Sequence, residues 1–256
     1  MPLTIQYCSD LHLEFDLNSR LVRRYPLEVK GDILLLAGDI VPFAVLDQHN
    51  YFFDFVSRNF KATYWVPGNH EYYGSDIARR NGAVMEAIRD NVFLVNNTSV
   101  AVDEETTLIC STLWSHINPA DELPVTKAMS DFHVINNGRG KLDIPTYNSL
   151  HDASLKFIEQ AVADAGSSRK IVMTHHIPTF MHYPAKYRGD LLSQAFATEL
   201  HDFIEPSNID YWIYGHHHCN TADFKIGNTF MLTNQLGYVK HGEHKDFRGG
   251  KIFVVE

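Results

Sequence analysis

The sequence has few cysteines and no long hydrophobic run. Its three cysteines, Cys8, Cys110 and Cys219, are too widely spaced to predict a disulfide framework, which favours a reducing compartment. No apolar run reaches the roughly 18 residues that indicate a transmembrane helix. The first residues also lack the basic segment and the small-residue cleavage site of a signal peptide. We therefore expect a soluble, cytoplasmic protein with no membrane partner.

Positive charge is also scarce. The chain has 22 Lys and Arg against 31 Asp and Glu, a formal net charge of −9. A broad nucleic-acid surface needs a clustered basic face, so this balance disfavours a nucleic-acid partner. It does not exclude a phosphate-bearing substrate, because bound divalent cations can dominate the local charge of a site.

The length and the apolar content favour one α/β domain over residues 1–256. The apolar fraction of 45% is enough for a large core. Residues 33–37 form an unbroken apolar run, which predicts a strand that is buried on both faces. A predicted helix at 46–60 and a strand at 62–66 follow it, and this order makes a βαβ unit. Asp39 lies just past the first of these strands, at the end where α/β folds place their sites.

Five stretches of residues suited to metal or proton chemistry each follow a predicted strand. The strand 62–66 is followed by Pro-Gly, which forces a turn, so Asn69, His70 and Glu71 are presented on a strand-end loop. One such stretch would indicate an ordinary turn, but the arrangement recurs. The other stretches are Asp10 with His12 after 3–8, Asp39 after 33–37, His175 with His176 after 170–174, and Gly215-His216-His217-His218 after 209–214.

The spacing within two of these stretches predicts which side chains converge. Side chains two residues apart share a face in an extended backbone. Asp10 and His12 are therefore expected to point the same way. The same alternation places His216 and His218 on one side and His217 on the other.

The rest of the chain is predicted from periodicity and turn signals. Further helices are expected at 75–90, 147–165 and 194–203, and further strands at 92–95, 99–102, 106–111 and within 224–255. Residues 15–31, 112–149 and 180–193 are expected to be loops, the last two as functional rim loops.

Taken in order, the five stretches resemble the calcineurin-like metallophosphoesterase superfamily. Its pattern is Asp-x-His, Gly-Asp, Gly-Asn-His-Asp/Glu, His and Gly-His-x-His, and the resemblance runs through almost the whole chain. Residues 174–178 and 212–216 look like a bacterial branch whose members are described only as phosphoesterases or phosphohydrolases. Where that branch tends to read Asn-Pro-Arg-Gly-Tyr, this chain has Asn-Gln-Leu-Gly-Tyr at 234–238 and lacks the arginine.

The resemblance implies an αββα sandwich, in which two stacked mixed sheets are flanked by helices, with two metal ions at the strand ends. It assigns Asp10, His12 and His218 to one ion, Asn69, His175 and His216 to the other, and Asp39 to both. Mixed carboxylate, amide and imidazole ligands suit Mn²⁺, Fe or Zn²⁺, and one carboxylate can bridge ions roughly 3.5–4 Å apart. The choice of His175 over His176 rests on the family pattern.

The expected catalytic residues are His70, Asp39 and Asn69. The resemblance does not use His70 as a ligand, which makes it the candidate general acid or charge stabiliser for the leaving oxygen. Glu71 is expected to orient His70 or another histidine.

The predicted function is a dinuclear metal-dependent phosphoesterase, in which a metal-bridging hydroxide attacks a phosphate mono- or diester of a small molecule. Monoesters, diesters, cyclic nucleotides and phosphoproteins all fit this chemistry, and selectivity is expected in the loops 112–149 and 180–193. A metal-dependent nuclease is the alternative that the net charge disfavours. A non-catalytic scaffold of the same fold is a further alternative, disfavoured because every expected ligand is present.

Overall fold

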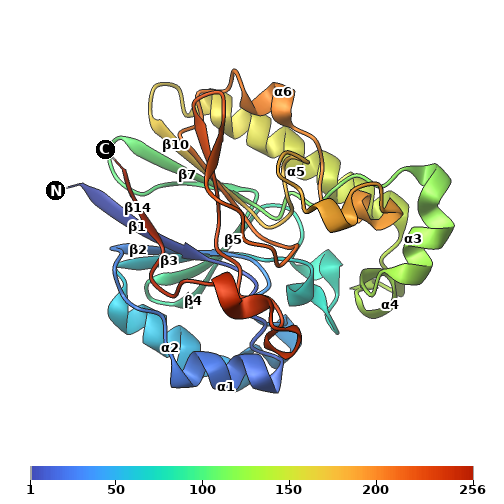
Figure 1. Cartoon of the computed structure of the whole chain (residues 1–256), viewed down its shortest axis with the longest axis horizontal. Helices are drawn as coiled ribbons and strands as arrows, with labels where there is room; N and C mark the ends of the chain where they lie inside the picture. Colours follow the sequence, from blue (N-terminus) through green and yellow to red (C-terminus); the bar gives the residue numbers. More distant parts are fainter. Residues whose placement is uncertain (1, 256) are drawn as a thin grey trace.

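Two six-stranded β-sheets stack face to face in the computed structural model, which describes residues 2–255 (Figure 1). The first sheet has the order β14 (Ile252–Val255), β1 (Leu3–Cys8), β2 (Ile33–Ala37), β3 (Ala62–Val66), β5 (Val92–Asn96) and β4 (Val84–Arg89). The second has the order β12 (Phe224–Ile226), β13 (Thr229–Thr233), β11 (Tyr211–Tyr214), β10 (Arg169–Thr174), β7 (Thr106–Ser111) and β6 (Thr98–Ala101). This is the two-sheet arrangement that the sequence resemblance implied.

Both sheets are parallel in the middle and antiparallel at their edges. β1, β2, β3 and β5 pair in parallel, and β14 and β4 flank them in antiparallel orientation. In the second sheet β13, β11, β10 and β7 are parallel, with β12 and β6 antiparallel at the edges. The carboxyl ends of parallel strands meet at one edge of a sheet, which is where α/β folds place their sites. The predicted ligand-bearing loops therefore lie near one another.

The buried strand β2 shows how the core is divided. Leu34 and Leu36 pack on one side in a cluster with α2 (Asn50–Asn59), and Leu35 and Ala37 pack on the other, between the two sheets. Side chains alternate along a strand, so a strand between two apolar layers must be apolar at every position. The unbroken run at 33–37 predicted this placement, and the structure confirms it.

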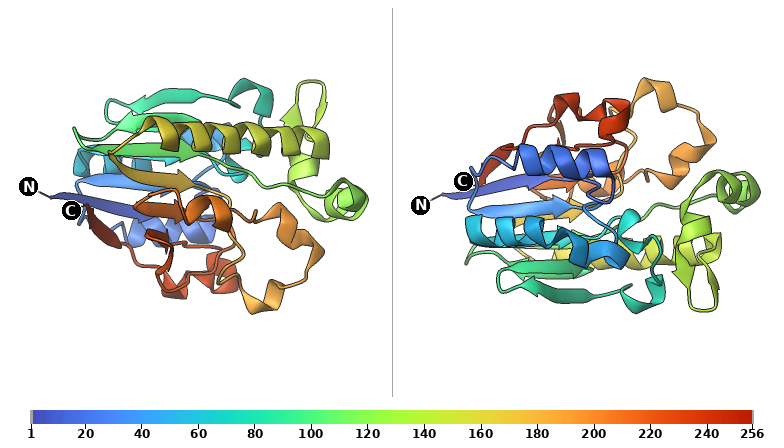
Figure 2. Two further views of the ribbon diagram at one scale, coloured as in Figure 1. Left: turned by 90° about the horizontal axis from the view of Figure 1, so that it is seen from above. Right: turned by 90° about the horizontal axis from the view of Figure 1, so that it is seen from below.

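Helices cover the outer faces of the sandwich (Figure 2). α1 (Asp16–Arg24) and α2 lie on the first sheet, and α5 (Ile144–Asp164) and α6 (His201–Ile204) lie on the second. α3 (Glu122–Ala128), α4 (Asp131–Val134) and the hairpin of β8 (Asn136–Asn137) and β9 (Gly140–Lys141) extend from one end. Short 3-10 segments occupy Phe43–His49, His70–Tyr72, Ile77–Arg79, Pro119–Asp121, Ala185–Tyr187, Leu191–Ala195, Val239–His241 and Glu243–Asp246.

Two predicted helices are wrong. Residues 75–90 contain a 3-10 turn and the edge strand β4, because Gly82 takes a left-handed turn (φ +74°) and β5 pairs with the segment that follows. Residues 194–203 do not form one helix either. Ala197 forms a parallel bridge with Ile177, and this pairing holds the chain extended between a 3-10 segment and α6.

Three other predicted boundaries also change. The expected loop 15–31 contains α1, whose Val22 is buried against the first sheet's outer cluster. The expected helix at 46–60 begins as the 3-10 segment Phe43–His49 before α2 starts. The expected loop 112–149 is largely structured by α3, α4, a hairpin and the first turn of α5.

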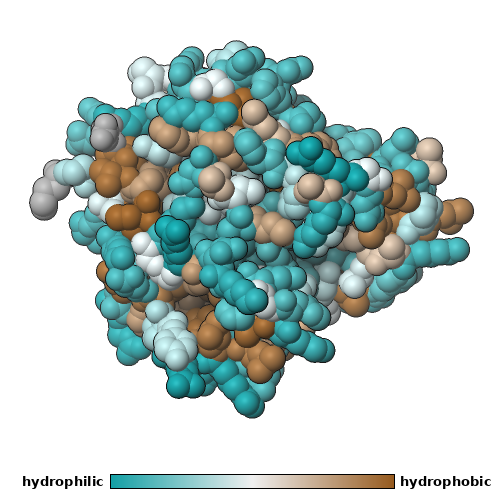
Figure 3. All heavy atoms as spheres, viewed as in Figure 1, coloured by the Kyte–Doolittle hydropathy of each residue, from teal (hydrophilic) through white to brown (hydrophobic). Residues whose placement is uncertain are grey.

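The surface in the view of Figure 3 is mostly hydrophilic, with separate apolar patches. One patch lies near the two chain ends, where Ile252 and Val254 of β14 are exposed, and another lies at the end that carries Leu123 of α3. Within residues 2–255, none of the helices combines the length and the apolar composition that crossing a bilayer requires.

Candidate metal centre

Three groups of possible metal ligands are found within residues 2–255, and the third consists of His12, Glu14 and His70. The other two share Asp39 and meet at the carboxyl ends of five parallel strands. One group contains Asp10, His12, Asp39 and His218, and the other contains Asp39, His175 and His216. Within each group the candidate donor atoms lie within 4.8 Å of one another. Asn69 joins the second group, because its Oδ1 lies 3.2 Å from Nε2 of His175. The structure thus brings together all seven residues that the sequence predicted as ligands.

Asp39 lies between the two groups. Its Oδ2 is 3.6 Å from Nε2 of His12, and its Oδ1 is 3.4 Å from Nε2 of His175. The same Oδ1 accepts a hydrogen bond from the backbone N–H of His70 at 2.9 Å. Burial alone would raise the pKa of Asp39, but the nearby His175 and His70 rings outweigh burial and hold this pKa well below its usual value. Asp39 therefore stays ionised between the two groups.

Several of these residues have an unusual backbone conformation. Positive φ angles occur at Asp10 (56°), His12 (47°), Asp39 (54°), His216 (85°) and His218 (53°). Side chains disfavour this region, at a cost of about 1–3 kcal/mol each, and such residues cluster at functional sites. The expected convergence of Asp10 with His12 is confirmed, and His216 and His218 each join a ligand group while His217 joins none within residues 2–255. The strand alternation used to predict this does not apply. Tight turns direct the side chains inward.

The ring nitrogens are arranged as a cation site requires. Nε2 of His12 and Nε2 of His218 face each other at 2.9 Å, while their Nδ1 atoms face Glu14 (3.1 Å) and Glu243 (2.8 Å). Burial lowers the pKa of His218, but its contacts with Asp10 and Glu243 raise it to about 10, so one proton lies between the two Nε2 atoms. A bound cation would take the place of that proton, with both rings neutral and donating from Nδ1 to the two carboxylates, which fix the tautomers.

The ring nitrogens of the second group are arranged in a similar way. Nε2 of His175 and Nδ1 of His216 are 3.0 Å apart, and Nδ1 of His175 faces the backbone oxygen of Ala37 at 2.9 Å. No Cβ fits at Gly68, since it would lie 2.2 Å from Oδ1 of Asp39 and 2.7 Å from Nε2 of His175. The buried donors and the glycine leave room for ions at this position.

Asp131 orients the amide of Asn69. Oδ1 of Asp131 accepts from Nδ2 of Asn69 at 2.9 Å and from the Tyr73 hydroxyl at 2.6 Å. Burial raises the pKa of Asp131, and its Oδ2 is buried with no hydrogen-bond partner within residues 2–255. Because the carboxylate of Asp131 accepts from the NH₂ group of Asn69, the amide oxygen of Asn69 faces His175 and the metal centre. Asp131 belongs to α4, and no sequence pattern pointed to its role.

His70 lies beside the metal centre, and the carboxylate that contacts its ring is Glu14 and not the predicted Glu71. Its Nδ1 lies 3.0 Å from Oε1 of Glu14, its Nε2 lies 3.3 Å from the Tyr238 hydroxyl, and its ring stacks on Tyr73 at 4.1 Å between centroids. Burial lowers the pKa of His70, but the Asp39 charge and the Glu14 hydrogen bond raise it by more, so the net shift is upward. Glu14 was not predicted to have a role, although it is two residues after His12.

Glu71 does not orient a histidine, so that prediction is wrong. Its Oε2 accepts from the N–H groups of Asp39 (2.9 Å) and Gly68 (2.7 Å). Its Oε1 accepts from Ile40 N (2.7 Å), Val41 N (3.4 Å) and Nε1 of Trp65 (3.1 Å). Burial, with the Asp39 charge, raises the pKa of Glu71 to about 8, against the opposing effect of these donors. Glu71 instead joins the Asp39 loop to the turn before Asn69.

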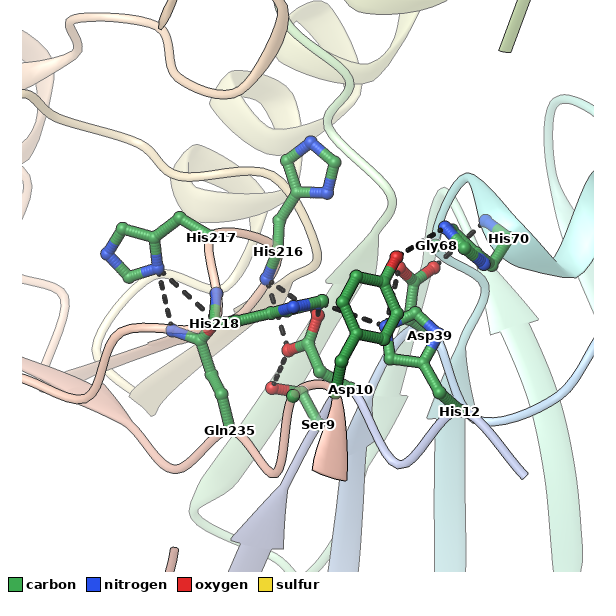
Figure 4. A network of polar contacts seen from close by, with 12 residues as sticks. Ser9, Asp10, His12, Asp39, Gly68, His70, His216, His217, His218 and Gln235 are labelled. Atoms are coloured by element: carbon green, nitrogen blue, oxygen red, sulfur yellow. Dashed lines mark hydrogen bonds and ion pairs between the residues drawn. The ribbon is translucent and has the colours of Figure 1, made fainter. Parts of the chain in front are cut away.

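His176 and His217 lie outside all three ligand groups found in residues 2–255. His176 contacts the Thr112 carbonyl and the Tyr147 hydroxyl, both at 3.3 Å, and burial holds its pKa well below the usual value. Figure 4 shows His217 turned away from Asp10, and its Nδ1 lies 2.9 Å from Nε2 of Gln235. Burial lowers the pKa of His217 to about 4. His176 is therefore placed as a packing residue, whereas His217 lines the cavity beside the centre.

A cavity of about 510 Å³ opens beside the metal centre. Its lining includes ligand residues such as Asp39, Asn69 and His216, together with His70. The expected rim loops contribute Met129 and Tyr183, which confirms that both 112–149 and 180–193 border the site.

The fold and these buried donors define a metal-binding hydrolase of the phosphoesterase type. The model of the calcineurin-like phosphoesterase family matches residues 3–220, and the chain belongs to this family. All seven predicted ligands lie within the matched span. The branch within the family stays a prediction.

Two similar proteins cover nearly the whole chain. The uncharacterized protein L509 of Acanthamoeba polyphaga mimivirus is 32% identical over 260 residues, which covers 91% of this chain and 91% of that protein. The structure of the phosphopantetheinyl hydrolase PptH from Mycobacterium tuberculosis superposes with a TM-score of 0.74 at 17% identity, covering 98% of this chain and 95% of that chain. The second likeness shows a shared fold.

Proposed function

We propose that this protein is a dinuclear metal-dependent phosphoesterase that hydrolyses a phosphate mono- or diester of a small molecule. One ion would be held by Asp10, His12 and His218, and the other by Asn69, His175 and His216. The observation that carries the proposal is the position of Asp39, whose two oxygens face the two histidine groups at 3.6 and 3.4 Å. One carboxylate placed in this way serves two ions.

The donor set suits hard to borderline ions. The groups contain carboxylate, amide and imidazole donors and no thiolate, a combination that fits Mn²⁺, Fe or Zn²⁺. When bound, two such ions would neutralise charge on the phosphoryl oxygens and lower the pKa of a water held between them.

The chain's own residues would complete the reaction. Glu14 holds Nδ1 of His70, so Nε2 of His70 is left for the cavity, where Tyr238 contacts it at 3.3 Å. Held in this way, a protonated His70 can give its Nε2 proton to the leaving oxygen or stabilise its negative charge. Asp131 keeps the amide oxygen of Asn69 on the metal side, and Glu71 holds the Asp39 turn.

The test combines metal analysis with turnover. The protein loaded with Mn²⁺ should bind two ions and hydrolyse 4-nitrophenyl esters of phosphate. Asp39→Asn should weaken binding of both ions and remove most of the activity, whereas Asp54→Asn, an exposed change on α2, should alter neither. Two bound ions and near-normal turnover in Asp39→Asn would refute the shared-ligand assignment.

A further inference from the structure

The cavity beside the metal centre is lined by four histidines, but by no lysine or arginine of the described chain. The lining also includes the carboxylates of Asp190 and Glu243. Much of the remaining wall is apolar or aromatic, and consists of Phe15, Tyr73, Met129, Tyr183, Phe196 and Tyr238. In the part of the cavity away from His70 and His218, uncharged groups therefore fit better than additional negative charge.

The two acidic groups are held in place. Oδ1 of Asp190 caps the 3-10 segment Leu191–Ala195 by accepting from Leu192 N at 2.9 Å. Oε2 of Glu243 accepts from Tyr238 N at 2.6 Å and lies 2.8 Å from Nδ1 of His218. Neither carboxylate can leave the cavity without giving up these contacts.

The cations that could be expected here are directed elsewhere. Lys186 places its ammonium over the ring of Tyr187, 4.5 Å from the centroid, and does not line the cavity. At position 236, where the sequence departs from an Asn-Pro-Arg-Gly-Tyr pattern, the chain has a leucine that is 2% exposed and packed in the core. No guanidinium group of the described residues lines the cavity.

Charge distinguishes the two classes of ester. A phosphomonoester carries up to two negative charges at neutral pH, whereas a diester carries one. Proteins normally meet the additional phosphate charge with Arg or Lys. Beyond the reach of His70, the additional oxygen of a monoester would face Asp190 or an aromatic wall, where an unpaired charge is costly. An uncharged second ester group would bury apolar surface against Tyr183 and Phe196 instead.

We propose that the substrate is a phosphodiester with at least one uncharged aromatic or apolar arm, which lies in this cavity. This inference rests on the proposed phosphoesterase function and names its substrate class. In the reaction, the oxygen of a water forms a new P–O bond and one ester P–O bond breaks. One proton from the water goes to the departing oxygen, and the products are an alcohol and a phosphomonoester. The more highly charged product then fits the cavity less well than the substrate.

Three esters with one leaving group test the substrate class on the Mn²⁺-loaded protein. They are 4-nitrophenyl phosphate, methyl 4-nitrophenyl phosphate and phenyl 4-nitrophenyl phosphate. We expect kcat/KM for the phenyl ester to exceed that for the methyl ester by about tenfold or more, from burial of the ring. The monoester should be the poorest of the three. A monoester that is hydrolysed as well as the diesters overturns the proposal, and equal rates for the methyl and phenyl esters overturn the apolar arm.

Binding supplies a readout that does not need turnover. Diphenylphosphinate has one charge and two rings, phenylphosphonate has up to two charges and one ring, and neither is hydrolysed. We expect the metal-loaded protein to bind diphenylphosphinate about tenfold more tightly or better in calorimetry. If two ions bind but no ester turns over, the proposed function fails. The order of these two affinities then decides the inference separately, and tighter binding of phenylphosphonate refutes it.

A change of charge in the cavity tests whether the lack of Lys and Arg causes the preference for diesters. Asp190→Arg should lower the ratio of diester to monoester kcat/KM by about tenfold, because it supplies the missing cation. Asp190→Asn, which can keep the cap on Leu192, should lower it by a smaller factor. Asp202→Arg makes the same change at a fully exposed position on α6 and should leave the ratio unaltered. Equal effects of Asp190→Arg and Asp202→Arg, or no change of the ratio in either Asp190 variant, refute the electrostatic argument.

Discussion

Glu71→Gln should destabilise the protein even though it replaces one oxygen by nitrogen. The Glu71 carboxylate is fully buried and accepts from five N–H donors, two on Oε2 and three on Oε1. A glutamine has one carbonyl oxygen, so its NH₂ group must face at least two of these donors.

The loss of stability follows from the smaller of the two sets of donors, the two N–H groups that bind Oε2. If the new oxygen takes the place of Oε1, the N–H groups of Asp39 and Gly68 lose their acceptor. Each buried donor without a partner costs about 1–3 kcal/mol, so the free energy of unfolding should fall by about 2–6 kcal/mol. Because these two groups hold the Asp39 turn and the turn before Asn69, affinity for metal should fall as well, by about 10–100-fold.

Urea unfolding and metal titration measure both effects, the unfolding above pH 8, where Glu71 is ionised in the folded protein because burial raises its pKa to about 8. Glu159→Gln is the matched control, since Glu159 is exposed on α5 and the change should alter the free energy of unfolding by less than about 0.5 kcal/mol. A loss below about 1 kcal/mol in Glu71→Gln would show that the buried donors find other acceptors, and the reasoning would be refuted.

Three further variants test the roles of individual side chains. His70→Asn should retain both ions while kcat falls by about 10²–10⁴-fold, with a larger loss on an alkyl ester than on a nitrophenyl ester, whose leaving group needs little protonation. Equal losses on the two esters would favour charge stabilisation over proton donation, and loss of an ion would make His70 a ligand. His217→Ala should keep two ions by metal analysis, whereas His216→Ala should lose one, because His216 lies in a ligand group of the described chain and His217 does not. Equal loss of metal in the two variants would contradict these positions of the two rings. Asp131→Ala should free the Asn69 amide to rotate and weaken binding of one ion by about 10–100-fold in a competition titration, and unchanged affinities for both ions would mean that Asp131 does not orient Asn69.

The five stretches that hold the predicted ligands came from local patterns because strand ends are local features, and the family resemblance assigned the ligands within them. Asp39 follows a run of five apolar residues, and a run buried on both faces can be read without knowledge of its neighbours. The parallel order of the strands then brings such ends together. The predicted helix at 75–90 failed for the opposite reason, because the pairing of β4 with β5 overrides the helical spacing of its apolar residues.

The carboxylates that contact the ligand residues could not be predicted from the sequence either. Glu14 contacts His12 two residues away, yet its contact with His70 spans 56 positions, and Glu243 meets His218 across 25. Asp131 reaches Asn69 across 62 positions from a short helix with no motif. Such partners depend on how loops pack, and the sequence contains no periodic pattern that reports this packing.

The sequence by itself determined the strand ends, the ligand types and their order, because each depends on residues that are neighbours along the chain. Tertiary structure decided which carboxylate faces which histidine, the left-handed turns that direct Asp10 and His12 inward, and the absence of Lys and Arg from the lining of the cavity within residues 2–255. These features arise from segments far apart in the sequence. Their energies come from burial and from hydrogen bonds that exist only once the two sheets have stacked.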